Sequence, residues 1–536
     1  MSTSTSHPAP ARTPSELSTA GDEEKALESV KGSDAQGVAA AGSHEHEIVS
    51  ETEGPFVKLS RHLKTLGVET RSLERVPEDQ RDELPFWRLA LRQITFWFSV
   101  NLSFSCLATG YLGSLYYTLD FKTSLAVIYL GVALGCAVSA TMATLGPKTG
   151  LRTMAIARFA GGFPGTAFMS VVNAVVQICY SISTAIVGGQ ALRAINGCSL
   201  VVGIVVLTVV VLVLCVYGYR YVHVWERWAW IGSFIIYCIV LGLGSRGDYD
   251  VDRLTPTMDE GRELTGDVLS FLGIMFSVGS GWTSIAADYN ITVPASTPSW
   301  IIWCSTWLGM YLPIVFTCTV SATFMALSKS DYVTAFEEDS LGGVVGHILI
   351  ENVGGFGKFL MVLLAFSTVS AQIPNCYSGA LCIQAIHPIL LRVPRILFVV
   401  LFTAIYLACA LAGREHLSEI VSNFAAILAY YTAFLASIVF VEVLWFRRKN
   451  GPLGGKTNWD DVADFSKLPP GIACCASIAC TIPVVVMGMA ATWYVGPIAL
   501  AIAKPYGGDL GFELSAGVSL VTYPLFRYAE IRYFGR

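Results

Sequence analysis

The 536-residue chain has few charged residues: 14% are Asp, Glu, Lys or Arg, whereas 53% are hydrophobic. Soluble domains typically carry about 25% charged residues, so this composition excludes an ordinary soluble protein. The chain also lacks a GxxxxGK[ST] phosphate-binding loop, which argues against an ATP-driven pump. No basic cluster lies deep within the hydrophobic stretches, so a phosphorylated nucleotide is a poor candidate substrate.

Metal-binding patterns are missing as well. The 14 cysteines form no CxxC pair and no Cys/His cluster with metal-ligand spacing. We therefore expect neither a structural zinc nor a disulfide framework, and no bound cofactor or metal. The expected partners are a lipid bilayer and a small molecule, and not a nucleic acid.

Long hydrophobic stretches dominate the rest of the chain. A helix needs about 20 apolar residues to cross a bilayer, and twelve stretches qualify. They lie near residues 96–119, 123–145, 165–192, 199–217, 227–245, 268–288, 299–326, 357–384, 396–413, 417–446, 470–495 and 509–528. The sequence thus predicts an all-α membrane protein with about twelve transmembrane helices, in a domain spanning residues 86–536.

The first 85 residues differ from this domain. They hold 16 of the 40 acidic residues and show no apolar periodicity, which predicts a disordered acidic tail that could engage trafficking machinery. With this tail placed inside, the inner connections carry fifteen Lys and Arg residues and the outer ones nine. The excess predicts that both termini are cytoplasmic.

Polar residues recur at helical spacing inside four stretches. The third has Asn173, Gln177, Tyr180 and Ser181 on one face, and the eighth has Gln372 and Asn375 beside Pro374. The first stretch contains Ser105 and the sixth contains Trp282. Four residues are the expected helix breaks in these stretches and the eighth: Gly110, Gly279, Gly281 and Pro374. Unwound membrane helices mark a binding site or pathway, so these features indicate a transporter.

The spacing of these stretches also predicts the architecture. The first and sixth, and the third and eighth, are each five stretches apart. This is the layout of two inverted repeats, near residues 93–245 and 267–446, with a site between two broken and two polar helices. A single Ser or Thr in a membrane helix often bonds only its own backbone. The prediction of a site therefore rests on the four polar stretches together.

Several segments resemble the fungal purine-cytosine permeases of the nucleobase:cation symporter family. They include Gly146–Arg152, Ile186–Arg193, Gly218–Arg227, Gly281–Tyr289, Lys467–Gly471, Thr492–Pro497 and Gly507–Leu514. The resemblance extends from about Pro85 to Arg536. It implies a five-plus-five inverted-repeat fold with discontinuous helices 1 and 6, two added helices near residues 470–528, and proton-coupled nucleobase uptake across a fungal plasma membrane.

The chain departs from that family where substrate is expected to bind. Family members commonly have two adjacent asparagines in the eighth span, whereas this chain has Ala371 and Gln372. Amide groups can pair with the edge of a base, so the departures favour a related heterocycle, such as pyridoxine, as the alternative substrate. Aromatic stacking contributes about 1–3 kcal/mol per base. We expect Trp282 and Tyr180 to stack on the ring, and Ser105, Asn173, Gln372 and Asn375 to read its edge.

The coupling group is less evident from the residues, because no carboxylate lies at the centre of a span. Glu226 and Asp288 are the coupling candidates, each of which could instead pair with a nearby arginine. The proton is implied by the resemblance, and a sodium ion held by carbonyls and hydroxyls remains an alternative. A membrane-embedded enzyme or sensor is disfavoured, since the buried polar residues are mostly amides and hydroxyls and no sizeable soluble output domain is present.

Overall fold

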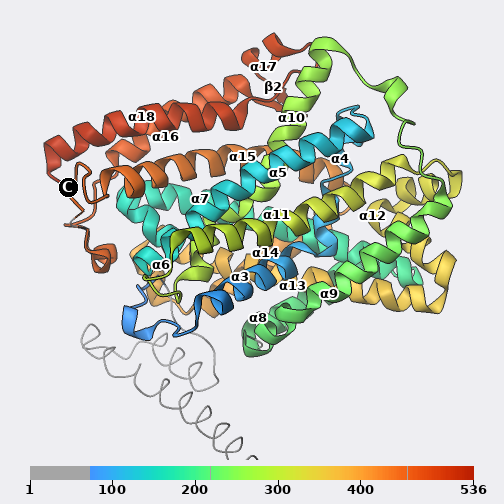
Figure 1. Cartoon of the computed structure of the whole chain (residues 1–536), viewed down its shortest axis with the longest axis horizontal. Coiled ribbons are helices and arrows are strands. Elements are labelled where there is room, and N and C mark those ends of the chain that lie inside the picture. The colour runs from blue at the N-terminus through green and yellow to red at the C-terminus, as the bar shows by residue number, and fades with distance from the viewer. Residues whose placement is uncertain (1–72, 218, 456) are drawn as a thin grey trace, which may run out of the picture. The chain divides into compact units, whose positions relative to one another are not determined.

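The computed structural model describes residues 73–217, 219–455 and 457–536, and within residues 217–229 it describes the backbone only. The described part of the chain is a helical bundle (Figure 1). Eight of its helices are long and apolar enough to cross a membrane, and two shorter apolar helices accompany them. Together with the broken first helix and the last one, they correspond to the twelve predicted spans.

The elements follow the predicted order. The first half contains α3 (Phe86–Asn101), η2 (Phe104–Ala108), α4 (Leu112–Tyr116), α5 (Phe121–Ala143), α6 (Leu145–Thr149), α7 (Thr153–Asn196), α8 (Leu200–Tyr217) and α9 (Tyr219–Gly244). The second half contains α10 (Gly261–Ser280), η5 (Gly281–Ser284), η6 (Ala286–Asn290), α11 (Ser299–Thr323), α12 (Ser330–Val353), α13 (Gly355–Ile386), α14 (Arg395–Gly413) and α15 (Leu417–Phe440).

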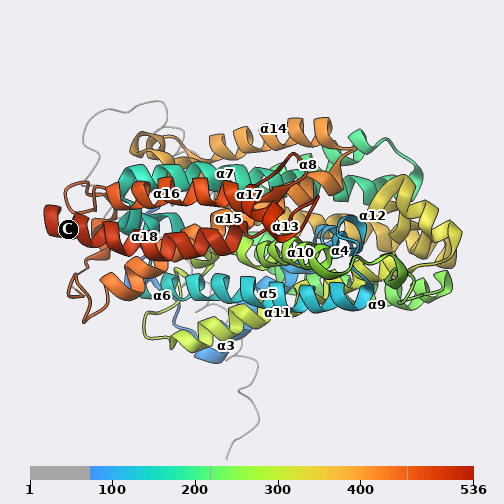
Figure 2. The ribbon, with the colours of Figure 1, turned by 90° about the horizontal axis from the view of Figure 1, so that it is seen from above.

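The remaining elements complete the bundle. A π-helical turn, η9 (Val441–Phe446), extends α15, and η10 (Trp459–Ala463) precedes α16 (Ile472–Gly488), the hairpin β1 (Ala490–Ala491) and β2 (Tyr494–Val495), α17 (Pro497–Ile502) and α18 (Gly511–Phe534). Short 3-10 turns are η1 (Glu78–Gln80), η3 (Ser245–Gly247), η4 (Thr255–Thr257), η7 (Phe324–Ala326) and η8 (Pro388–Arg392). The helices α16 and α18 pack on each other and on α15 (Figure 2).

The packing has the symmetry of an inverted repeat. The contact between α3 and α11 corresponds to the contact between α10 and α5. In the same way, the contact between α3 and α9 corresponds to the contact between α10 and α15. Likewise, α7 packs on α8 as α13 packs on α14. At the centre, α7 and α13, which the repeat relates, make an extensive contact with each other. This pattern matches the predicted pairing of spans one to five with spans six to ten.

Both predicted discontinuous helices are interrupted. The helix α3 ends at Asn101, and the chain continues through η2 and a turn containing Gly110 before α4 begins. The helix α10 contains Gly279 and ends at Ser280, where Gly281 opens η5. By contrast, Pro374 lies inside α13 without ending the helix. Of the expected breaks, those in the first and sixth spans are therefore present, and the one in the eighth is not.

Two further features differ from expectation. The helix α12 lies between the seventh and eighth predicted spans, in a segment that was not predicted to be a helix. In addition, residues 73–85, which we assigned to the disordered tail, are ordered. Val76 N–H donates to Gly150 O (2.9 Å), Arg81 Nη1 to Pro147 O (2.6 Å), and Asp82 N–H to Thr292 O (2.8 Å). These bonds fix the segment to two loops of the bundle. Residues 1–72 of the predicted tail lie outside the described residues.

Candidate functional site

The two broken helices meet at an aromatic and amide cluster. Trp282, in η5, donates its indole N–H to Asn101 Oδ1 at the end of α3, at 3.0 Å. Asn101 in turn donates to Trp97 O (2.9 Å), and the Trp97 and Trp282 rings lie edge to face with centroids 5.4 Å apart. The break in one repeat is thus tied directly to the break in the other. Sequence reasoning did not assign a site role to Trp97 or Asn101.

Tyr180 reaches the same place from α7. Its ring lies edge-on to Phe424 of α15, with centroids 4.8 Å apart. Its hydroxyl lies against Gly281, where an added Cβ would be only 2.2 Å from the hydroxyl oxygen. Glycine is therefore required at position 281 for Tyr180 to approach the break. Of the predicted pair of aromatics, Tyr180 thus approaches Gly281 and Trp282 follows it in the chain, and both remain partly exposed.

Ser105 lies in η2, on the opposite broken helix. Its hydroxyl is 3.0 Å from the hydroxyl of Ser103, which caps η2. The η2 segment is held against α13, because Phe104 N–H donates to Ser367 Oγ at 2.9 Å. Ser105 is also partly exposed, whereas Ser103 is buried. This places the Ser105 hydroxyl on the interrupted segment itself, available to a bound molecule.

The amide groups of α7 form a second polar group along the helix from Tyr180. Asn173 donates to Cys382 Sγ of α13 (2.9 Å), and Gln177 Nε2 donates to Asn173 Oδ1 (3.3 Å). Among the described residues, the buried Gln177 Oε1 and Ser181 Oγ have no hydrogen-bond partner. Buried polar atoms are normally paired, so these two atoms are open to water or a ligand.

The polar residues of α13 divide between two faces. Ser367 faces η2, whereas Gln372 lies in a small cavity lined by Thr208 of α8 and Tyr406 of α14. Five residues correspond to about 140° of rotation around a helix, which accounts for this separation. Asn375 is buried, at 4% exposure. The structure therefore does not bring Gln372 together with Trp282, and Ala371 lies closer to the face that Ser367 occupies.

The carboxylates near the broken helices have structural partners. Asp288 Oδ1 accepts a hydrogen bond from Thr153 N–H (2.8 Å) in the first turn of α7, where a carboxylate complements the helix dipole. The side chain of Glu226 lies outside the described residues. Within the described ranges, no group of three or more His, Cys, Asp or Glu residues could hold a metal ion.

A third carboxylate, Glu442, lies in a fully buried ion-pair network. It accepts from Arg447 Nε (2.7 Å), Arg527 Nε (2.9 Å), Arg527 Nη2 (3.0 Å) and Tyr523 Oη (2.9 Å). Arg527 also pairs with Glu530 at 2.8 Å. This network joins η9, at the end of α15, to α18.

Comparison with known proteins identifies the family. A family model described as permease for cytosine/purines, uracil, thiamine, allantoin matches residues 75–453. Purine-cytosine permease fcyB of Emericella nidulans is 32% identical over 491 residues, covering 90% of this chain and 93% of that protein. The vitamin B6 transporter TPN1 of Saccharomyces cerevisiae is 30% identical, covering 89% of this chain and 90% of its own length.

The fold has a solved counterpart. The structure of MHP1, a nucleobase-cation-symport-1 family transporter, in a closed conformation with bromovinylhydantoin bound, matches with a TM-score of 0.64 at 16% identity. The match covers 88% of this chain and 97% of that one. It confirms the predicted transporter fold. The extent of the family match shows that the chain belongs to the family of permeases for cytosine and purines, uracil, thiamine and allantoin.

Proposed function

We propose that the protein is a secondary active transporter that takes up purine bases or cytosine, and that the substrate binds where Trp282 and Tyr180 meet. The observation that carries this proposal is the convergence of both aromatics on the Gly281 break, beside the amide of Asn101. Flat rings stack on such side chains with about 1–3 kcal/mol per base. Ser105, Gln177 and Ser181 supply hydroxyl and amide groups along the adjoining segments.

The positions of the side chains indicate which residues would bond to the edge of the base. Gln177 Oε1 and Ser181 Oγ are unpaired acceptors on α7 within the described residues, and Ser105 lies across from α7 on η2. Asn173 is engaged with Cys382 and positions Gln177. Asn375 is also proposed to read the edge of the base, since it is buried on α13 three residues beyond Gln372. Gln372 is assigned instead to the α8–α13–α14 contact.

A second candidate substrate is vitamin B6. TPN1, a vitamin B6 transporter, is as similar to this chain as several purine-cytosine permeases are, at 30% identity. Ala371 also replaces one of the paired asparagines that purine-cytosine permeases commonly carry. Alanine offers no amide to the edge of a base, so a ring that needs no amide partner at this edge loses less affinity here than cytosine does.

Uptake and competition measurements test the proposal. Cells lacking their own permeases would express the chain, and radiolabelled cytosine and adenine uptake would be competed with purines, pyrimidines and pyridoxine. Trp282→Ala should weaken all flat substrates without changing their rank order. Trp300→Ala, which removes a tryptophan that is 68% exposed, is the matched control. Unchanged affinity in Trp282→Ala would contradict the assignment of the site.

We further propose that a proton gradient drives uptake across the plasma membrane, with both termini cytoplasmic. The support is the excess of basic residues in the inner connections and the family resemblance. A protonophore should abolish accumulation above equilibrium, and external sodium should be dispensable. Accumulation that persists after the gradient is collapsed, or that requires sodium, would exclude proton coupling.

A further inference from the structure

A cavity lies between the ends of α4, α7, α12 and α15. It is separate from the Trp282 cluster and from the small cavity beside Gln372. Its volume is about 600 Å³, within the range of small-molecule sites. Helices α4 and α12 lie at the end of the bundle opposite the C-terminus (Figure 1). Because the C-terminus is proposed to be cytoplasmic, this cavity belongs to the outer side.

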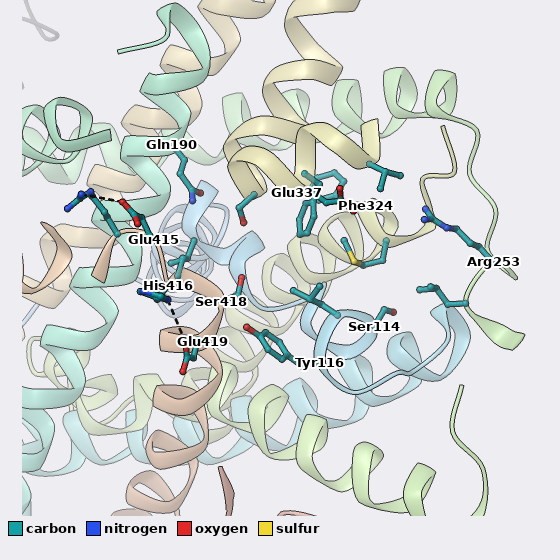
Figure 3. Close-up of a pocket in the computed structure, with 18 residues that line it drawn as sticks. Ser114, Tyr116, Gln190, Arg253, Phe324, Glu337, Glu415, His416, Ser418 and Glu419 are labelled. Atoms are coloured by element: carbon teal, nitrogen blue, oxygen red, sulfur yellow. Dashed lines mark ion pairs between the residues drawn. The ribbon is translucent and has the colours of Figure 1, made fainter. Parts of the chain in front are cut away.

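Gln190, near the end of α7, is directed into this cavity (Figure 3). The residue is 5% exposed, and its Oε1 has no hydrogen-bond partner within the described part of the chain. The helix α12 approaches its backbone closely, since a Cβ at Gly342 would be 2.7 Å from the Gln190 carbonyl carbon. A buried amide with an unpaired acceptor is costly to leave unsatisfied, so the position calls for a polar partner in the cavity.

The rest of the lining is aromatic and charged in both signs. Tyr116, Phe324 and Phe336 contribute ring surface. Arg414 pairs with Glu415 at 3.3 Å, and His416 lies 3.8 Å from Glu419. Arg253 and Glu337 add one charge of each sign (Figure 3). The lining therefore holds two arginines against three glutamates, and four of its ionisable groups are paired with each other. This small net charge favours an uncharged ligand, which the rings can stack on and the amide can orient.

The base of the cavity separates it from the broken helices. Ser418 lines the cavity, and its hydroxyl is 2.9 Å from that of Tyr111. Tyr111 is fully buried and packs edge to face on Phe336, with centroids 5.3 Å apart. A molecule in the cavity therefore lies against the segment that contains Tyr111, and the residues of the Trp282 cluster do not line the cavity.

We propose that this cavity is a second binding site for a small, uncharged, planar heterocycle, which it holds through Gln190 and the surrounding rings before Tyr111 gives way. This proposal rests on the proposed function, because it takes the ligand to be of the class that is transported. Its affinity is set by residues different from those of the central site, so the two sites can be separated by mutation.

The test uses Val333→Cys, which places a thiol in the cavity lining, and a membrane-impermeant thiol reagent applied to intact cells. Labelling of the chain without the added cysteine is subtracted. Cytosine, adenine and pyridoxine should each be tested for protection of the added thiol. Protection should persist when Trp282→Ala is combined with Val333→Cys, and its half-protecting concentration should rise fivefold or more in Gln190→Met.

A second variant covers the case in which Gln190→Met fails to reach the surface. Tyr116→Ser removes a ring that is 41% exposed and should weaken protection in the same way. Protection that disappears with Trp282→Ala, or that survives both Gln190→Met and Tyr116→Ser, would overturn the second site. If no heterocycle is taken up or protects the thiol in any background, the proposed function itself fails.

Discussion

The buried network around Glu442 gives the sharpest prediction about stability. Glu442→Gln removes the negative charge that pairs with Arg447 and Arg527 while keeping the size of the side chain. All atoms of the Glu442 side chain are buried, and the Arg527 side chain is equally inaccessible. Removing one partner of a buried ion pair typically destabilises a protein by 3–5 kcal/mol. We expect a value near the lower end, about 3 kcal/mol, because Arg527 keeps its pair with Glu530.

The exposed pair of Lys122 and Asp252 is the matched control. Its separation is 2.8 Å, but the two side chains are 69% and 67% exposed, and such pairs contribute about 0–1 kcal/mol. Thermal melting of the purified protein in detergent should therefore show a large loss for Glu442→Gln and little change for Asp252→Asn. Equal melting of the two variants would refute the reasoning. If Glu442→Gln instead melts normally and loses only proton-driven accumulation, Glu442 carries the coupled proton.

Three further predictions address the site and the outer surface. Gly281→Ala should displace the Tyr180 hydroxyl, which lies where the new methyl group would be, and should lower uptake per surface molecule; normal uptake would show that this approach is dispensable. Ala371→Asn should shift the rank order of competing heterocycles. Gln372→Asn should leave that order unchanged, because Gln372 faces α8 and α14. The opposite result would place Gln372 at the substrate. Burial raises the pKa of Asp339 in α12 to about 6, despite the opposing effect of Arg193, against about 4 in an unfolded chain. Ionisation of Asp339 therefore destabilises the folded state as the pH rises from about 4 to about 6. The melting temperature of Asp339→Asn should exceed that of the wild type above pH ~6 and equal it below pH ~4. A difference in melting temperature that does not depend on pH would contradict this.

Hydrophobic length and polar periodicity were sufficient to predict most of the fold. Stretches such as residues 121–143 and 395–413 can be recognised because a bilayer requires a continuous apolar helix. The helix α12 was not predicted because its apolar run, residues 341–350, is about half the length of a membrane span, and its first half contains Asp331, Glu337 and Glu338. Residues 73–85 also escaped it, since their order depends on backbone bonds to loops that are distant in the sequence.

The site could be predicted only in part. Trp282 and Tyr180 stood out as aromatics beside glycines or on a polar face, and the structure brings them together at Gly281. Periodicity shows which residues share a face but not which neighbour that face contacts, so the sequence could not show that Gln372 lies against α8 and α14. The pairing of Glu442 with Arg527 spans 85 residues, and no local pattern connects them.

The attachment of α15 is unequal along its length. Toward α18, Glu442 and Arg527 are joined by buried charges, and the Tyr430 hydroxyl donates to Asp509. Toward the segment around α4, the described side-chain hydrogen bonds are two hydroxyl contacts, Tyr111 with Ser418 and Tyr117 with Ser422. Each such bond contributes only about 0.5–1.5 kcal/mol. Breaking both bonds costs about 1–3 kcal/mol, which corresponds to a population of roughly 1–15% when no other contact changes, whereas release of α15 from α18 would be far rarer. The unloaded protein should thus sample outer access spontaneously and without any input of energy.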